Sequence, residues 1–139
     1  MMKNLQMIPL KKLTLVLIFV FSIGFIGCET DDSNVDDNPV EKYLGTWKVS
    51  DQPARLNYEV IIERNPANTA YIFLKNFADL GGNAVGLVVG NSVIIDKQTL
   101  VDEFQVEGTG SYISSTELRF EYSLDDGIDI ENRIAVFSK

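Results

Sequence analysis

Apolar and polar residues alternate in short runs along the chain from residue 45 to the C-terminus. The run ELRFEYSL shows this most clearly, because every second side chain is apolar or aromatic. These side chains are Leu118, Phe120, Tyr122 and Leu124. A period of two residues is typical of a half-buried β-strand. The pattern therefore predicts a strand here, with this set on the buried face.

Seven further stretches have the character of strands. They are TWKVS, NYEVIIER, AYIFLKNF, the apolar run 84–89, SVIID, VEGTGSYI and IDIENRIAVF. In TWKVS, Trp47 and Val49 share one face, and in IDIENRIAVF, Ile128 and Ile130 alternate with acids. AYIFLKNF does not show which of its faces is buried. The glycines of VEGTGSYI indicate a bend or close packing.

Turn signals separate these strands. They are Asn65-Pro66, Gly81-Gly82-Asn83, Gly90-Asn91 and Asp126-Gly127. Asp126-Gly127 is a candidate for the type I′ turn of a hairpin, and no stretch after residue 45 has a helical period. About eight strands joined by hairpins predict an all-β fold, an antiparallel up-and-down barrel, because closure removes exposed strand edges.

The first 27 residues have a different composition. Three lysines and no acid accompany the fifteen uncharged residues 13–27, LTLVLIFVFSIGFIG. A basic start followed by a short apolar run is typical of a secretory signal. A membrane-spanning helix, the alternative, needs about 20 apolar residues. We therefore interpret residues 1–27 as a signal peptide.

The only cysteine, Cys28, follows this segment directly. The tetrapeptide Phe25-Ile26-Gly27-Cys28 resembles a bacterial lipobox, in which a small residue precedes the cysteine. The resemblance implies cleavage before Cys28 and attachment of acyl chains, such as palmitate, to its sulfur and new amino group. Two or three such chains hold a protein on a membrane far more firmly than one. Plain cleavage at Ser22 and Gly24 is the alternative.

Residues 28–40 continue after the cysteine as ETDDSNVDDNPV, with five acids and no base. Such a segment cannot collapse and is expected to be a disordered linker. The acids Glu29, Asp31 and Asp32 also resemble the export signal of surface lipoproteins in the Bacteroidetes group. That resemblance implies a lipid-anchored protein of the outer membrane, displayed at the cell surface. A simple spacer is the alternative.

From Cys28 onward the chain has 9 basic and 20 acidic residues, a net charge of −11. Such a surface repels phosphate backbones, which argues against a nucleic acid partner. The 112 residues of this part suit one domain, and we expect residues 41–139 to form it.

The stretch YLGTW, residues 43–47, is similar to the Gly-x-Trp signature that opens the first strand of lipocalins. The later pattern GTGSY…ELRFEYSLDDG resembles small lipocalin-like (calycin-type) lipoproteins of the Bacteroidetes group. The resemblance implies a short helical turn before Gly45 and a barrel whose closed end is plugged by Trp47. In that family a basic residue of the last strand often covers the tryptophan by cation–π contact, and Arg133 is the candidate.

The sequence argues against catalysis. It has no histidine, which is the commonest general base and metal ligand. It has neither a Gly-x-Ser-x-Gly elbow nor a phosphate-binding glycine loop. The acidic run 125–131 lacks the spacing of an EF-hand, so we expect a solvated hairpin with Asp129 and Glu131 on its wet face rather than a calcium site. We expect no enzymatic activity, metal or cofactor.

A binding role is easier to motivate. In a hollow barrel, the inward-facing Tyr58, Phe120 and Tyr122 would contact a small hydrophobic or amphipathic ligand. The interior of a small barrel is only wide enough for side chains, so a filled barrel is the alternative. Exposed aromatics such as Tyr71 or Phe73 would then recognise a glycan or a partner protein.

Overall fold

The computed structural model describes residues 38–139. These residues lie within one compact unit. The expected signal peptide, Cys28 and the export acids Glu29, Asp31 and Asp32 lie outside the described residues.

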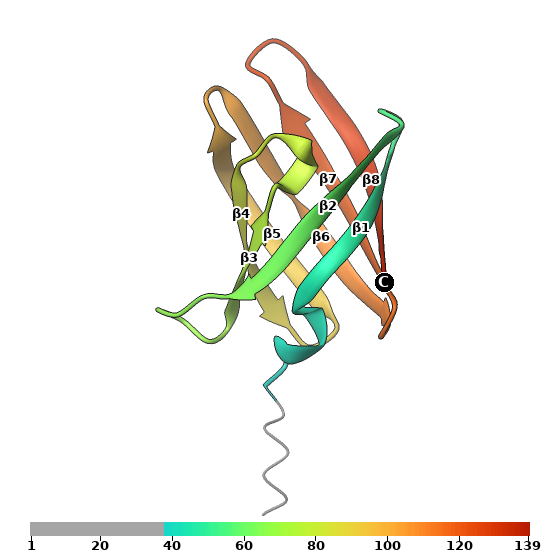
Figure 1. The fold of residues 1–139 in the computed structure, drawn as a ribbon. Coiled ribbons are helices and arrows are strands. Elements are labelled where there is room, and N and C mark those ends of the chain that lie inside the picture. The colour runs from blue at the N-terminus through green and yellow to red at the C-terminus, as the bar shows by residue number, and fades with distance from the viewer. Residues whose placement is uncertain (1–37) are drawn as a thin grey trace, which may run out of the picture. The chain divides into compact units, whose positions relative to one another are not determined.

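Eight antiparallel strands form a closed barrel (Figure 1). Each strand pairs with the next one in the sequence, and β1 also pairs with β8, which closes the sheet. The strands are β1 (Gly45–Gln52), β2 (Leu56–Arg64), β3 (Tyr71–Lys75), β4 (Asn83–Val89), β5 (Ser92–Val101), β6 (Phe104–Ser114), β7 (Glu117–Asp125) and β8 (Ile130–Ser138). The predicted all-β, up-and-down barrel is confirmed.

Alternate side chains of every strand point into the barrel and form its core, as the period of two requires. The largest fully buried ones are Trp47, Tyr43, Phe77, Phe120, Phe137, Ile62, Ile72, Leu74, Ile95 and Leu118. Gly110 and Gly108 make room for two inward aromatic rings. A Cβ at Gly110 would lie 2.3 Å from the ring of Phe120, and a Cβ at Gly108 would lie 2.5 Å from the Cβ of Tyr122. Close packing therefore explains the glycines of this strand.

One end of the barrel, here called the closed end, is covered by the 3-10 turn η1 (Glu41–Tyr43), which lies beside the start of β1 (Figure 1). The fully buried Trp47 donates a hydrogen bond from Nε1 to the carbonyl oxygen of Tyr43, at 2.7 Å. The hydroxyl of Tyr43 donates to the carbonyl oxygen of Gly90 in the β4–β5 turn, at 3.2 Å. These two bonds fix η1 across the closed end. Val40, which the sequence pattern assigns to the linker, is buried in the core.

A second 3-10 turn, η2 (Phe77–Asp79), lies between β3 and β4 and inserts Phe77 into the barrel. The ring centroid of Phe77 lies 4.7 Å from that of Tyr122 and 5.9 Å from that of Phe120. The side-chain amide of Asn76 donates to the carbonyl oxygen of Glu59 at 3.0 Å, which ties the loop to β2. Aromatic side chains therefore fill the middle of the barrel.

The strand β3 resolves the ambiguity of AYIFLKNF. Ile72 and Leu74 are buried, while Tyr71 and Phe73 are on the outer face and half-buried. Lys75, which the opposite choice would bury, forms an ion pair with Glu63 of β2 at 2.7 Å.

The start of β8 differs from the expectation. Ile128 and Ile130 are 89% and 66% exposed, whereas Glu131 faces inward, paired with the buried Leu124. The expected phase is therefore wrong at this end, because the inner face becomes polar as the strand reaches the rim. The β7–β8 connection also spans four residues, 126–129, rather than a two-residue type I′ turn. The carboxylate of Asp126 organises it by accepting hydrogen bonds from the backbone N–H groups of Ile128 and Asp129.

Within residues 38–139, no helix has the length and apolar character needed to cross a membrane.

Candidate functional site

The strand β1 carries a carboxyl group into the barrel. Trp47, Val49 and Asp51 alternate along β1 and point inward, and the side chain of Asp51 is fully buried. Burying a carboxyl group is costly unless it is hydrogen-bonded or paired with a cation. The neighbours of Asp51 are therefore the natural place to look for function.

Two tyrosines donate hydrogen bonds to the same carboxylate oxygen. The hydroxyl of Tyr58 on β2 lies 2.9 Å from Oδ2 of Asp51, and the hydroxyl of Tyr122 on β7 also donates to that atom. Burial raises the pKa of the Tyr58 phenol, and the neighbouring Tyr122 and Asp51 raise it further. Burial and the hydrogen bond to Asp51 raise the pKa of the Tyr122 phenol. Both phenols are therefore neutral donors near neutral pH.

Arg133 of β8 completes the cluster. Its Nη1 lies 3.6 Å from Oδ2 of Asp51, and its side chain is only 11% exposed. Its Nε and Nη2 donate to Oε2 of Glu131 at 3.1 and 2.9 Å. Burial works against the charge of the guanidinium, yet the hydrogen bonds to Glu131 raise the pKa of Arg133 overall. The guanidinium thus lies between two carboxylates.

Two buried atoms of this cluster have no hydrogen-bond partner in residues 38–139. They are Oδ1 of Asp51 and Nη1 of Arg133. Nearly all buried polar atoms in folded proteins are hydrogen-bonded. Leaving such an atom unpaired costs about 1–3 kcal/mol, and more where it is charged. A polar cluster with spare bonding capacity is therefore a candidate for ligand contact.

A cavity of about 370 Å³ lies next to this cluster, at the end of the barrel opposite η1. We call this end the mouth; the β5–β6 and β7–β8 turns surround it (Figure 1). The cavity is lined by Phe104, Leu124, Asp126, Asp129, Glu131 and Arg133. It combines an apolar wall, three carboxylates and the outer side of Arg133. Its volume falls at the lower end of the range of about 300–1,000 Å³ that is usual for small-molecule sites.

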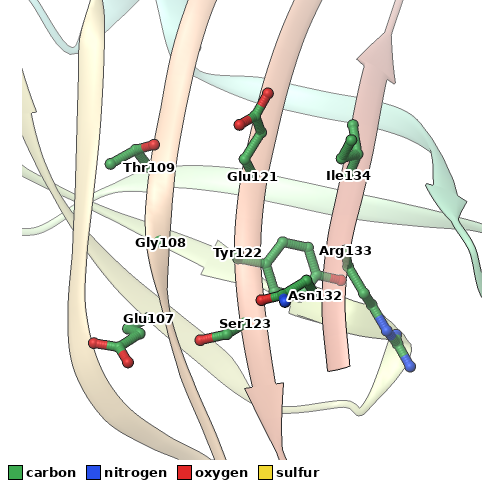
Figure 2. Close-up of a pocket in the computed structure, with 9 residues that line it drawn as sticks. All are labelled: Glu107, Gly108, Thr109, Glu121, Tyr122, Ser123, Asn132, Arg133 and Ile134. Atoms are coloured by element: carbon green, nitrogen blue, oxygen red, sulfur yellow. The ribbon is translucent and has the colours of Figure 1, made fainter. Parts of the chain in front are cut away.

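A larger, open groove of about 580 Å³ crosses the outer surface of β6, β7 and β8 (Figure 2). Its outward-facing residues include Glu107, Thr109, Glu121, Ser123 and Asn132. Figure 2 shows Gly108 in the middle of this surface, where no side chain covers the strand. We favour the mouth despite its smaller volume, since the groove is shallow and mostly polar, whereas ligand sites are concave and mainly apolar.

At the closed end, the structure corrects the identity of the basic residue. The cation over Trp47 is Lys139, whose Nζ lies 4.1 Å from the ring centroid and donates to the carbonyl oxygen of Leu44 at 2.8 Å. Arg133, the candidate from the sequence, is instead held near the mouth by Asp51 and Glu131. Gly45 has a φ of +115°, and a Cβ there would lie 3.1 Å from Nζ of Lys139. The glycine of Gly-x-Trp is thus required by both backbone conformation and space.

The three aromatic residues expected to bind a ligand have different positions. Tyr58 and Tyr122 meet at Asp51, whereas Phe120 lies deep in the core, with its ring centroid 4.7 Å from that of Phe137. Phe120 is fully buried and therefore packs the barrel.

Sequence reasoning does not identify several residues of the site, although signals for two of them are present. Alternation from Trp47 and Val49 places Asp51 on the inner face, and the same rule places Arg133 with Phe137. The pairing of these two charges joins β1 and β8, the first and last strands, and becomes visible only when the barrel closes.

No group of three or more potential metal ligands of the Asp, Glu, Cys or His type gathers within the described part of the chain. The hydrogen bonds from the backbone of Asp129 and Ile128 lower the pKa of Asp126, so this carboxylate serves the turn. The acidic hairpin is therefore described as a hydrogen-bonded turn at the rim of the mouth.

Comparisons with known proteins agree with the fold. No protein-family model matches the chain, and no curated protein matches it. Among solved structures, the chain is similar to a redesigned β-barrel at 13% sequence identity and a TM-score of 0.53, over 73% of this chain and 95% of that one. At this level of identity the similarity shows the architecture alone: a closed, antiparallel β-barrel.

Proposed function

We propose that this protein is a lipid-anchored lipoprotein of the cell envelope whose lipocalin-like barrel binds a small amphipathic molecule at its mouth. The observation that carries the proposal is the cavity of about 370 Å³ beside a buried cluster with two unpartnered polar atoms. Phe104 and Leu124 offer an apolar wall, and Arg133 and Glu131 offer polar contacts. A ligand with one apolar and one polar part fits both.

Filling the cavity tests this proposal. The change Leu124→Trp adds bulk to the lining, and Ile113→Trp adds the same indole at an exposed position on β6. The assay is titration with the neutral fluorescent probe N-phenyl-1-naphthylamine, using the chain without its first 28 residues, which retains the whole barrel. We expect Leu124→Trp to weaken probe binding by about tenfold or more, which corresponds to about 1.4 kcal/mol, and Ile113→Trp to leave it unchanged.

A second variant guards against misfolding of the first. Phe104→Ser removes apolar wall rather than adding volume, so it should weaken the same binding without overpacking. Circular dichroism verifies that each variant keeps its β-structure. Equal probe affinity in the wild type and both mouth variants would refute a ligand site at the mouth.

The anchor part of the proposal depends on the tetrapeptide Phe25-Ile26-Gly27-Cys28. Expressed at full length in a bacterium, the wild type should partition into membranes with the mass of a cleaved, acylated chain. The variant Cys28→Ser should keep the precursor mass or become soluble. Unchanged mass and membrane partitioning in Cys28→Ser would contradict the anchor.

Display at the cell surface depends on the acids behind the cysteine. Replacing Asp31 and Asp32 with alanine should reduce digestion of the protein by protease added to intact cells. Digestion at the wild-type rate would remove the export proposal and leave the anchor untouched.

A second function is favoured by one specific observation: apolar side chains on the outer face of β3, β4 and β5 lie next to one another. Tyr71 pairs with Leu87, which pairs with Ile94, and Phe73 pairs with Val85. We call this set the outer strip. Aromatic side chains are enriched at protein interfaces, so the strip would suit a glycan or a partner protein.

The two functions separate in one binding assay. The double variant Tyr71→Ser/Phe73→Ser changes the outer strip and leaves the mouth intact. If it abolishes adhesion of the protein to cells or glycans while probe binding at the mouth is retained, the strip is the functional surface. If adhesion is unaffected, the second function is rejected.

A further inference from the structure

We infer that the ligand of the mouth is an organic cation, an ammonium group carried on a compact apolar body. This inference rests on the proposed function and adds the charge of the ligand to it. Three carboxylates and one guanidinium line the cavity, so the site carries an excess of negative charge.

The arginine does not offset this excess for an incoming ligand. Arg133 already lies between Asp51, at 3.6 Å, and Glu131, at 2.9 Å. An anionic ligand would have to compete with both carboxylates for the guanidinium. It would also approach Asp126 and Asp129 on the rim, which repel it.

A second observation points to the same chemistry. The carboxyl group of Asp51 is fully buried directly behind Arg133, and its Oδ1 has no hydrogen-bond partner in residues 38–139. Together with Glu131 it makes the floor of the site rich in acceptors. A ligand that donates hydrogen bonds suits this floor, and an ammonium group offers donors and a positive charge together.

The apolar wall sets the rest of the ligand. Phe104 and Leu124 line the side of the cavity beside β6 and β7. An aromatic ring or a short alkyl chain would pack there, and the cation would point toward Asp129 and Glu131. The cavity of about 370 Å³ suits a molecule with a single ring rather than a long lipid.

The test uses three probes with the same apolar body and different charge: 2-phenylethylamine, 2-phenylethanol and phenylacetate. Each competes with N-phenyl-1-naphthylamine for the wild-type barrel at pH 7. We expect the amine to displace the probe at concentrations about 3- to 10-fold lower than the alcohol, and phenylacetate to be weakest. Raising the salt from about 20 mM to about 500 mM should weaken the amine and leave the alcohol unchanged.

A matched pair of variants assigns the preference to the mouth. Asp126→Asn/Asp129→Asn removes two charges at the rim, and asparagine at 126 can still accept the two backbone hydrogen bonds of the turn. Glu59→Gln/Glu117→Gln removes two exposed charges elsewhere on the barrel. We expect the first variant to lose the preference for the amine over the alcohol and the second to keep it.

Failure of the inference and failure of the proposed function give different results. If the neutral probe binds at the mouth but the alcohol or phenylacetate displaces it as well as the amine does, the inference of a cation is overturned and the proposed function remains. The inference is also overturned if both double variants keep the preference. If Leu124→Trp does not weaken binding of the neutral probe, the proposed function fails first and the inference fails with it.

Discussion

At the scale of single residues, the most informative group is the carboxyl of Asp51. It is fully buried, accepts hydrogen bonds from two tyrosines and pairs with Arg133. Asp51→Asn keeps the shape and an acceptor oxygen but removes the charge that faces the guanidinium. Breaking a buried pair costs about 3–5 kcal/mol, and the remaining contact with Glu131 places the expected loss near the lower figure.

Urea unfolding measures this loss, and a double variant separates its causes. Asp51→Asn/Arg133→Met removes both charges, so it should recover part of the free energy of unfolding, with a coupling of at least about 0.5 kcal/mol. Additive losses in the two single variants would show that the pair does not interact energetically.

The two buried phenols predict how stability changes with pH. Burial raises the pKa of Tyr58 and Tyr122 in the folded state above the usual value of about 10. Below about pH 10 both states bind these protons, so the stability is complete. As the pH rises above this value, the unfolded chain loses the protons and the folded chain keeps them, so the free energy of unfolding falls.

Urea midpoints between about pH 8 and 11 measure this decline. The variant Tyr58→Phe/Tyr122→Phe should show a shallower decline than the wild type. A residual slope is expected from Tyr43, because burial raises its pKa to about 12. An identical decline in the wild type and the variant would show that neither phenol contributes.

At the scale of elements, η2 places an aromatic plug that no strand pattern describes. Phe77 is fully buried against Phe120 and Tyr122. Phe77→Ala should therefore lower the free energy of unfolding by about 3–5 kcal/mol. Phe73→Ala, on the outer face of β3, is the matched control and should cost less than about 1 kcal/mol. Equal losses in the two variants would contradict the assigned facing of β3 and the role of η2.

The strands are predictable because each follows a local rule. Alternation and turn residues identify all eight strands, and closure follows from the need to hide strand edges. The facing of β3 is not predictable, since both of its faces are apolar apart from Lys75. The phase of β8 is misleading in the sequence because Ile128 and Ile130 are exposed at the rim, where the inner face is polar.

The candidate site is only partly predictable. The alternation identifies Tyr58 and Tyr122 as inward-facing, yet it gives no sign that they share Asp51 as a partner. Contacts between β1 and β8 depend on barrel closure, which no local pattern encodes. Lys139 over Trp47 is a similar case, because the C-terminal residue reaches the first strand only in the closed barrel.

At the scale of the whole barrel, the two ends differ in chemistry. The chain enters at the closed end beside η1, where Lys42 and Lys139 lie over aromatic rings. The mouth, at the other end, carries Asp126, Asp129 and Glu131. A lipid tether that precedes η1 would therefore hold the protein by its closed end and leave the mouth free for a ligand.

Mapping a bound probe on the barrel by NMR tests the central claim most directly. In a titration of the ¹⁵N-labelled chain without its first 28 residues with N-phenyl-1-naphthylamine, the amide signals of Phe104, Leu124 and residues 126–133 should shift together and saturate. Those of Tyr71, Phe73 and Leu87 on the outer strip should stay in place. Saturable shifts confined to the outer strip, or no saturable shifts at the mouth, would contradict a ligand site at the mouth of this barrel.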